Sequence, residues 1–193
     1  MRFRNAVPAL VAIAIATAMA PAIARQAAKT EGFLCCNMRS FDGEVYDINY
    51  DDEGARIVPF GSPLTVTKQG RRKLRLLVDG EKHVIENHYS RDLSDAEFAA
   101  RYVVAEDPRI AAAGFPEKIR EAIASARITP GMNREQVAMS LGWPVSSENP
   151  DLDADVWRFW LGSFEEIQVE FDAAGLVVDA SASPLTRRKI WLP

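Results

Sequence analysis

The sequence predicts an α+β protein, and three observations lead to this fold class. Residues 33–90 contain short runs in which apolar and polar residues alternate, separated by glycine and proline. Residues 91–141 carry apolar residues at helical spacing, and residues 156–181 return to strand-like alternation. Strands and helices that are segregated along a chain favour α+β packing with antiparallel sheets.

The first predicted unit is a small antiparallel β module over residues 33–90. We expect strands at Val45–Tyr50, Pro63–Thr67 and Arg71–Val78. Asp79-Gly80 is a strong hairpin signal, because such pairs accept the positive φ angles of a type I′ turn. Glu81–Ile85 is then the return strand. Short strands with Gly and Pro between them predict a small barrel.

A helical connector is predicted over residues 91–114. Ser94 and Glu97 are spaced as a capping box, in which each side chain accepts a hydrogen bond from the other residue's backbone. The helix is expected to run to about Val104. Asp107-Pro108 interrupts it, because a residue before proline disfavours the helical conformation.

The C-terminal unit is predicted over residues 115–183, followed by a tail at 184–193. One helix begins near Pro116 and turns an apolar face to the core. That face consists of Ile119, Ala122, Ile123 and Ala126. Asn133 caps a further helix. Gly142 is expected to end this helix in a left-handed backbone conformation, and Pro144 prevents the helix from continuing. The three strands expected next are Val156–Leu161, Glu166–Phe171 and Leu176–Ser181.

A compact motif of Gly-Met, a capped helix, Leu-Gly-x-Pro and aromatic strands occupies the last third of the chain. Its landmarks are Gly131, Met132, Val137, Leu141, Gly142, Pro144, Trp157, Phe159, Val169, Phe171 and Gly175. This motif resembles the small domain of BamE, also called SmpA or OmlA, a component of outer-membrane protein assembly in Gram-negative bacteria. The resemblance implies two helices on one face of a three-stranded sheet and a scaffold or binding role. We interpret the landmark residues themselves as architectural.

The stretch Gly61-Ser62-Pro63-Leu64-Thr65-Val66 resembles the entry into SH3-like bacterial domains. This resemblance implies an SH3-like β module, and it offers recognition of a cell-wall component or another small ligand as an alternative function. The helix–helix–strand order of the C-terminal unit also looks similar in fold to β-lactamase-inhibitor proteins. An enzyme inhibitor is therefore a second alternative.

The first residues predict export. Arg2 and Arg4 precede an alanine-rich apolar run, and Ala22-Ile23-Ala24 forms an A-x-A site, so we expect a signal peptide over residues 1–24 and a periplasmic protein. An uncleaved anchor is the alternative. BamE-type proteins are usually lipoproteins, but no lipobox precedes Cys35 or Cys36. We therefore expect no lipid anchor, and peripheral association with the outer membrane at most.

The two adjacent cysteines are expected to stay unbridged. A bond between neighbours closes an eight-membered ring and distorts the peptide between them, and neighbours on a strand point to opposite faces. We expect one buried thiol and one exposed thiol or mixed disulfide, in a compartment that oxidises thiols. The C-x-x-C spacing of redox motifs is missing.

The charge of the chain argues against a nucleic-acid partner. The formal net charge is −4, and it becomes −6 once residues 1–24, with two arginines and no acids, are removed. A mildly acidic chain with dispersed charges lacks the basic surface that nucleic acid requires.

No set of residues in the sequence predicts an enzyme, a cofactor or a metal site. His83 and His88 are five residues apart, so on an extended chain they point to opposite faces and cannot share a metal. Glycine-rich phosphate loops are absent, and no local pattern activates a cysteine. We expect a protein that does not catalyse a reaction.

The predicted interface is the outer face of the C-terminal sheet. Alternation places Trp157, Phe159 and Leu161 against the helices. The opposite face then carries Val156, Arg158, Trp160, Gln168 and Val177. A Trp and an Arg on a polar sheet face are typical of interface hot spots, although Trp160 packing against the β module or the tail near Trp191 is the alternative. The expected partners are envelope proteins, including outer-membrane assembly components.

Overall fold

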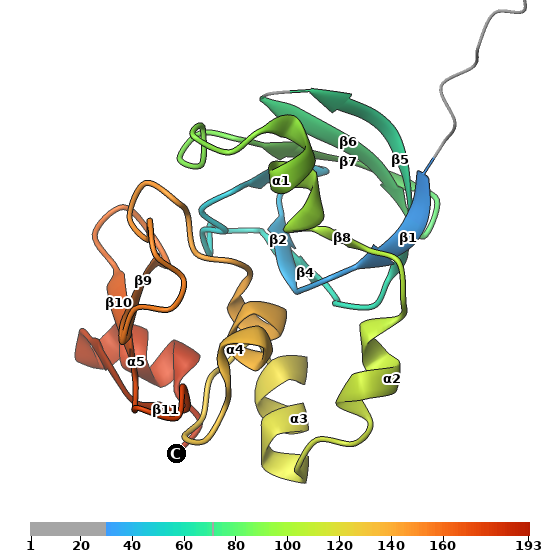
Figure 1. Ribbon diagram of the computed structural model, residues 1–193. Helices are drawn as coiled ribbons and strands as arrows, with labels where there is room; N and C mark the ends of the chain where they lie inside the picture. The colour runs from blue at the N-terminus through green and yellow to red at the C-terminus, as the bar shows by residue number, and fades with distance from the viewer. Residues whose placement is uncertain (1–29, 71) are drawn as a thin grey trace, which may run out of the picture.

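The computed structural model describes residues 30–70 and 72–193 and shows an α+β protein (Figure 1). The predicted signal peptide and Arg71, the first residue of one predicted strand, lie outside the described residues. The strands are β1 (Thr30–Leu34), β2 (Met38–Ser40), β3 (Glu44–Tyr46), β4 (Arg56–Val58), β5 (Pro63–Gly70), β6 (Lys73–Val78), β7 (Glu81–Glu86), β8 (Val103–Val104), β9 (Val156–Trp160), β10 (Glu166–Phe171) and β11 (Val177–Ala182). The helices are α1 (Asp95–Ala100), α2 (Pro108–Ala112), α3 (Glu117–Ala124), α4 (Arg134–Leu141) and α5 (Pro184–Ile190). No helix in this described part has both the length and the apolar character needed to cross a bilayer.

A six-stranded sheet forms most of the N-terminal half. Its strand order is β3-β7-β6-β5-β1-β8, and β2 and β4 make a separate two-stranded sheet. The predicted β6–β7 hairpin is confirmed: Asp79 and Gly80 have φ angles of 49° and 84°, as a type I′ turn requires. The expectation of a wholly antiparallel module is wrong at one edge, where β3 runs parallel to β7. A parallel pair needs a long connection, and three strands separate β3 from β7 in the chain.

The N-terminal core lies between this sheet, the small β2–β4 sheet and α1. Its buried members are Leu34, Met38, Val45, Val58, Leu64, Leu74, Leu76, Val78, Ile85, Phe98, Ala99 and Tyr102. The capping box that begins α1 is confirmed, with the Ser94 side chain accepting from the Glu97 amide and the Glu97 carboxylate from the Ser94 amide.

The first helix is shorter than predicted. It ends at Ala100, and Val103–Val104 form β8, which pairs with Phe33 and Leu34 of β1. The helical pattern fails here because β1 offers an unpaired edge and β-branched valines fit a sheet better than a helix end. Gly32 permits this approach, since a Cβ there would lie 2.6 Å from the Val104 carbonyl oxygen.

Asp107-Pro108 interrupts the chain as expected, but it also begins a helix that was not predicted. The Asp107 carboxylate accepts from the Arg109 amide, and Pro108 is the first residue of α2. Pro116 precedes α3 as its N-cap. The predicted apolar face of this helix is buried, although Ala126 lies beyond the helix end with a φ of 51°.

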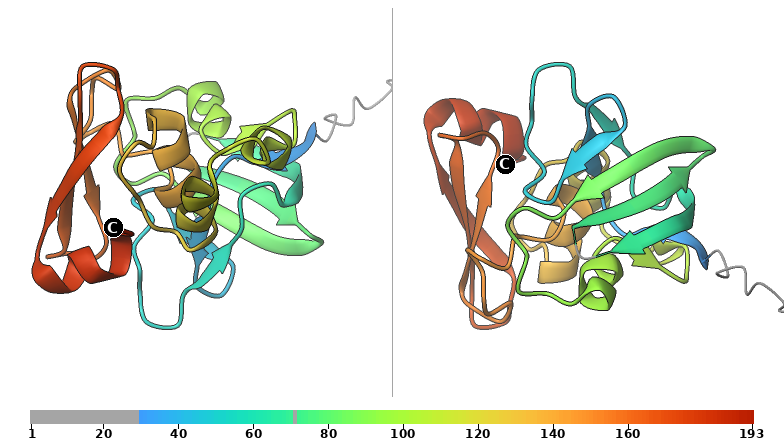
Figure 2. Two further views of the ribbon diagram at one scale, coloured as in Figure 1. Left: turned by 90° about the horizontal axis from the view of Figure 1, so that it is seen from below. Right: turned by 90° about the horizontal axis from the view of Figure 1, so that it is seen from above.

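The three predicted C-terminal strands are confirmed to within one residue at each end, and they form an antiparallel sheet in the order β11-β10-β9. Helices α3 and α4 cover one face of it. Figure 2 shows these helices as a middle layer between the C-terminal sheet and the N-terminal half. The core of this unit includes Ile119, Ile123, Ile128, Met132, Val137, Leu141, Trp157, Phe159, Ile167, Val169, Phe171 and Ile190.

Several of the motif residues make contacts that hold the C-terminal unit together. The amide of Gly131 donates to Val177, and the amide of Val177 donates to Met132, so the Gly-Met segment pairs with the start of β11. Asn133 caps α4 with its side chain. Gly142 has a positive φ of 85°, as expected, but its ψ of 168° is extended rather than left-handed helical. A Cβ at Gly142 would lie 3.2 Å from the amide nitrogen of the Asn49 side chain.

The last ten residues do more than form a tail. Ser183 caps α5, and Ile190 at its end is fully buried in the C-terminal core. The amide of Ile128 donates to Ile190, and the amide of Leu192 donates to Ile128. This helix was not predicted from the basic run that fills it.

Two buried asparagines join the halves of the molecule at the end of α4. The amide of Asn37 donates to the Met139 carbonyl at 2.9 Å, and its side chain donates to Ser140 at 3.2 Å. The Asn49 side chain donates to the Leu141 carbonyl at 2.7 Å. Helix C-termini leave carbonyls without partners, so the N-terminal half satisfies those of α4.

Candidate interaction surfaces

The outer face of the C-terminal sheet is open to solvent and largely polar. Val156 and Arg158 are exposed there. The Arg158 guanidinium pairs with Glu166 at 2.8 Å and Glu148 at 3.1 Å, and the Gln168 side chain also donates to Glu166. These charges are already paired within the chain, which leaves the predicted face with little free binding chemistry.

Two members of the predicted interface are placed differently from its other residues. Trp160 is half-buried and lines a small cavity with Arg39 and Ile48 of the N-terminal half, as the alternative interpretation expected. Val177 is buried in the core and pairs with Phe171, so its assignment to the outer face is wrong. The cause is a β-bulge after Glu170, which shifts the register and reverses the alternation of β11.

A cluster of aromatic side chains lies at the surface where β3 and β7 end. Tyr46 and Tyr89 are 39% and 43% exposed. The His88 ring lies between them, with centroid distances of 5.4 Å to Tyr46 and 6.3 Å to Tyr89. We call Tyr46, Tyr50, His88 and Tyr89 the aromatic surface. Tyrosine provides a large contact area at low entropic cost, which makes it frequent in protein-binding sites.

A buried carboxylate fixes the backbone of this surface. Asp47 is 2% exposed, and its two carboxylate oxygens accept from the amides of His88 at 3.1 Å and Tyr89 at 2.9 Å. The amide of Asp47 donates in turn to the Glu86 carbonyl. Charge-assisted hydrogen bonds are among the stronger ones in proteins. The backbone that carries the His88 and Tyr89 rings is therefore fixed by Asp47.

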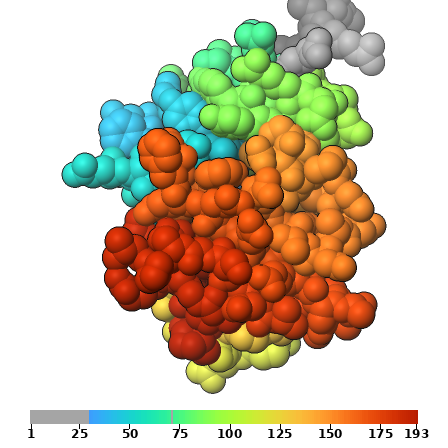
Figure 3. Space-filling view, turned by 90° about the vertical axis from the view of Figure 1, so that its left-hand side faces the viewer, coloured from blue at the N-terminus to red at the C-terminus, as the bar shows by residue number. Residues whose placement is uncertain are grey.

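The aromatic surface extends to the C-terminal half through the turn between β9 and β10. The Tyr50 side chain lies near Ser163 and Tyr89, and desolvation, followed by the neighbouring Tyr89, raises its pKa. The amide of Asp51 donates to the Leu161 carbonyl at 2.9 Å. Figure 3 shows the orange C-terminal segment lying against the blue and cyan atoms of the N-terminal half. Phe164, next to Ser163, is 98% exposed.

An ion-pair group borders the aromatic surface. The Glu86 carboxylate accepts from His88 Nε2 at 2.9 Å and pairs with Lys73. The hydrogen bond from Lys73, and next the one from His88, lower the pKa of Glu86. The carboxylate therefore stays charged well into mild acid and orients the His88 ring.

A serine, a histidine and a glutamate approach one another in the N-terminal half. Ser40 Oγ lies 3.1 Å from His83 Nδ1, and His83 Nε2 lies 3.9 Å from the Glu81 carboxylate. These residue types occur in hydrolase triads. Here Ser40 is only 1% exposed, and 3.9 Å is too long for a hydrogen bond. The pair joins β2 to β7, and Ser40 is almost fully covered, although it borders a hollow of about 320 Å³ together with Glu81 and Lys82.

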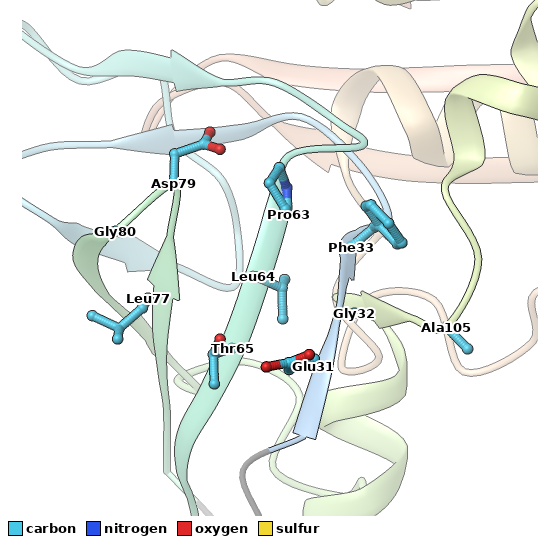
Figure 4. A pocket seen from close by; sticks show the side chains of 10 residues that line it. All are labelled: Glu31, Gly32, Phe33, Pro63, Leu64, Thr65, Leu77, Asp79, Gly80 and Ala105. Atoms are coloured by element: carbon cyan, nitrogen blue, oxygen red, sulfur yellow. The ribbon is translucent and has the colours of Figure 1, made fainter.

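A hollow of about 530 Å³ lies over β1, β5 and β6 (Figure 4). Its lining includes the apolar side chains of Phe33, Pro63 and Leu77 and the acidic side chains of Glu31 and Asp79. The figure shows Glu31 and Phe33 along β1 beside Leu64 and Thr65 of β5. Such a mixture suits a ligand with both an apolar portion and a positive charge.

Cys35 and Cys36 form a disulfide with each other, so the expectation of an unbridged pair is wrong. Both are also buried, at 8% and 1% exposed. The sharp change of direction between β1 and β2 brings the two sulfurs together, in place of the strand geometry that was assumed. Among residues 30–70 and 72–193, no three His, Cys, Asp or Glu side chains are grouped so as to hold a metal ion.

Sequence reasoning missed the aromatic surface and the Ser40–His83 contact. Both join segments about 40 residues apart, and no spacing rule connects them. The one available signal was the run His88-Tyr89 after a predicted strand, together with the tyrosines at 46 and 50.

Comparisons of the chain with protein-family models, with curated proteins and with solved structures found no match.

Proposed function

We propose that this chain is a non-enzymatic periplasmic protein that binds other proteins of the cell envelope, with outer-membrane assembly components as the expected partners. The proposal joins three elements: export by the N-terminal segment, an SH3-like N-terminal module, and a BamE-like C-terminal unit. The order of helix, helix and three antiparallel strands supports the last of these.

The aromatic surface carries the proposal. Tyr46, His88 and Tyr89 are exposed together, and the Asp47 carboxylate holds two of them by their backbone. The surface also reaches the β9–β10 turn, so a partner would contact both halves at once. Preorganised aromatic side chains reduce the entropic cost of association.

A binding role is also supported by what surrounds the candidate nucleophile. Ser40 is covered, and desolvation, followed by the charge of Arg56, lowers the pKa of His83. The His83 imidazole is neutral and buried, and it has no carboxylate within hydrogen-bond distance. Its contact with Ser40 therefore suits a structural hydrogen bond. The mildly acidic charge of the chain likewise favours a protein partner over nucleic acid.

Crosslinking in intact envelopes tests the proposal. The wild-type chain should capture a defined set of envelope proteins, and Tyr46→Ala combined with Tyr89→Ala should reduce their recovery about 10-fold or more, the effect expected of hot-spot residues. Leu185→Ala, which removes another exposed apolar side chain from α5, is the matched control and should leave recovery unchanged. Equal recovery with all three proteins would refute the aromatic surface as the site.

The hollow over β1, β5 and β6 favours a second candidate function, recognition of a cell-wall component or another small ligand by the SH3-like module. Its apolar lining beside Glu31 and Asp79 is the observation behind it. Sedimentation with isolated peptidoglycan sacculi separates the two functions. Binding that Glu31→Gln weakens and the tyrosine variants do not would favour the small-ligand role over the protein-binding role.

A further inference from the structure

The Cys35–Cys36 disulfide lies where three parts of the chain meet. It follows β1 directly and precedes β2. The amide of Cys35 donates to the Tyr102 carbonyl at 2.9 Å, and the amide of Asn37 donates to the Met139 carbonyl of α4 at 2.9 Å. The bond is thus fixed between the connector after α1 and the C-terminal half.

One of the two sulfur-bearing residues faces an open groove. Cys35 lines a groove of about 250 Å³ with side chains from the connector, α4 and the residue after Gly142. The other lining residues are Ala100, Val104, Pro108, Glu135, Ala138, Met139 and Trp143. Cys36 does not line the groove and is 1% exposed, against 8% for Cys35. Access to the disulfide is therefore one-sided.

The surroundings of the sulfurs also suit the reduced pair. The Arg101 carbonyl oxygen lies 2.7 Å from the Cys35 sulfur and 3.7 Å from that of Cys36. A disulfide sulfur carries no hydrogen, so in the oxidised form these are contacts only. Reduction gives each sulfur a hydrogen, and the carbonyl is already placed to accept one. The two thiols would therefore have a nearby polar partner in an otherwise buried position.

We propose that Cys35–Cys36 is a thiol–disulfide exchange site that a dithiol reductant reaches through this groove. A thiolate of the reductant attacks the Cys35 sulfur, the Cys35–Cys36 bond breaks, and Cys36 leaves as a thiolate that takes up a proton. The second thiolate of the reductant then attacks the reductant sulfur that is bonded to Cys35. This step releases Cys35 as a thiolate, which also takes up a proton. The chain gains two electrons and two protons, and the reductant becomes a disulfide.

The two faces of the site predict which cysteine reacts. With Cys36→Ser, the thiol of Cys35 remains at the groove, and with Cys35→Ser, the thiol of Cys36 remains behind it. We expect the first variant to react with an aromatic disulfide reagent about 10-fold faster than the second, because access limits exchange. Equal rates, or faster reaction at Cys36, would overturn the proposal. So would a mass showing two thiols in the unreduced wild-type protein.

Blocking the groove distinguishes two routes of reduction: entry of the reductant through the groove, and reduction of the disulfide in the unfolded chain. Ala100 is exposed and lines the groove, so Ala100→Trp should slow reduction by dithiothreitol several-fold without lowering the midpoint of thermal unfolding. Ala113→Trp, which occupies a different apolar hollow beside Phe60, is the matched control and should leave the rate unchanged. If the reduction rate instead follows the unfolding rate in every variant, the groove is not the entry route. Trp143 fluorescence reports the reaction, with Trp143→Phe as the blank.

Discussion

Arg134, in the first turn of α4, connects separate segments of the C-terminal unit. Its guanidinium lies 4.5 Å from the ring centroid of Phe171 and donates to the carbonyls of Asp153 and Ala154 at 2.9 and 2.8 Å. A Cβ at Gly175 would come within 2.5 Å of the guanidinium nitrogen Nη1. The glycine therefore leaves the space through which this side chain reaches its partners.

Substitution of Gly175 tests this arrangement. Gly175 has a φ of 75°, so Gly175→Ala strains the backbone and also displaces Arg134. We expect the free energy of unfolding to fall by about 1–3 kcal/mol, measured by urea denaturation. Gly114→Ala is the matched control, because its Cβ would meet its nearest neighbour, the Ala111 carbonyl, at an ordinary 3.6 Å. A loss of the same size in both variants would argue against the role of Arg134.

The buried imidazole of His83 makes stability depend on pH. Burial, and next the charge of Arg56, lower the pKa of His83 in the folded chain, while the unfolded value is about 6.5. Between these two values the unfolded chain binds more protons, so stability falls as the pH is lowered below about 6.5 and is complete above it. Denaturant midpoints between pH 8 and 5 measure the slope. His83→Gln should flatten it, and an unchanged slope in His83→Gln would disprove the assignment.

The C-terminal end of α4 depends on residues far from it in the chain. The N-terminal cap of α4 is local, since Asn133 and Gln136 form a capping box at the start of the helix. At its other end, Gly142 donates to the carbonyl of Ala138, and the last three carbonyls accept from Asn37 and Asn49. Since helix ends buried without partners are costly, α4 is completed only when the N-terminal half is present.

Removal of the Asn37 side chain tests this dependence. Asn37→Ala deletes the buried donors to Ser140 and Ile123 and the part-buried acceptor for the Phe60 amide. We expect the free energy of unfolding to fall by about 2–4 kcal/mol, since unsatisfied buried groups cost more than the bond itself contributes. Asn133→Ala, which removes only a local cap, should cost about 1 kcal/mol. Equal losses would show that the junction contributes no more than an ordinary helix cap.

The elements that the sequence predicts correctly carry local signals. The capping box at Ser94, the Asp79-Gly80 turn and the alternation of β9 each depend on residues close together in the chain. The elements it does not predict depend on distant partners. β8 exists because β1 has a free edge, and α5 is stabilised by Ile190 in the C-terminal core. Periodicity within a segment contains no information about either partner.

The candidate interaction surfaces also include residues that local sequence patterns place correctly and residues that they do not. Alternation alone was enough to place Arg158 outside and Trp157 inside. It failed for Val177, because a bulge adds one residue to a strand without leaving a sequence signature, and every residue beyond it changes face. The aromatic surface could not be predicted, since Asp47 and Tyr89 meet only through the parallel pairing of β3 with β7.

At the scale of the whole molecule, hydrogen bonds and ion pairs join the two halves along their boundary. Helices α3 and α4 lie between the two larger sheets (Figure 2). The β9–β10 turn meets Asp51, the Ser147 amide between α4 and β9 donates to the Tyr89 carbonyl, and Lys189 of α5 pairs with Asp51. These contacts, around Asp51 and at Tyr89, oppose independent movement of the halves, and the aromatic surface lies across the second.

We therefore expect the described part of the chain to unfold in one cooperative transition. All four tryptophans lie in the C-terminal half, at positions 143, 157, 160 and 191, and three of them report on that half, while Trp160 also borders Arg39 and Ile48. Leu76→Ala removes a buried side chain from the N-terminal core and should destabilise by about 2–5 kcal/mol.

If the halves unfold together, Leu76→Ala must lower the urea midpoint seen by the tryptophans, although none of them lies near position 76 in the chain. Amide hydrogen exchange in β5–β7 should give the same stability as fluorescence. Ile57→Ala, at a half-exposed position of the same half, is the control and should shift the midpoint little. A tryptophan transition that Leu76→Ala leaves unchanged would show that the halves unfold independently, and a partner could then bind one without ordering the other.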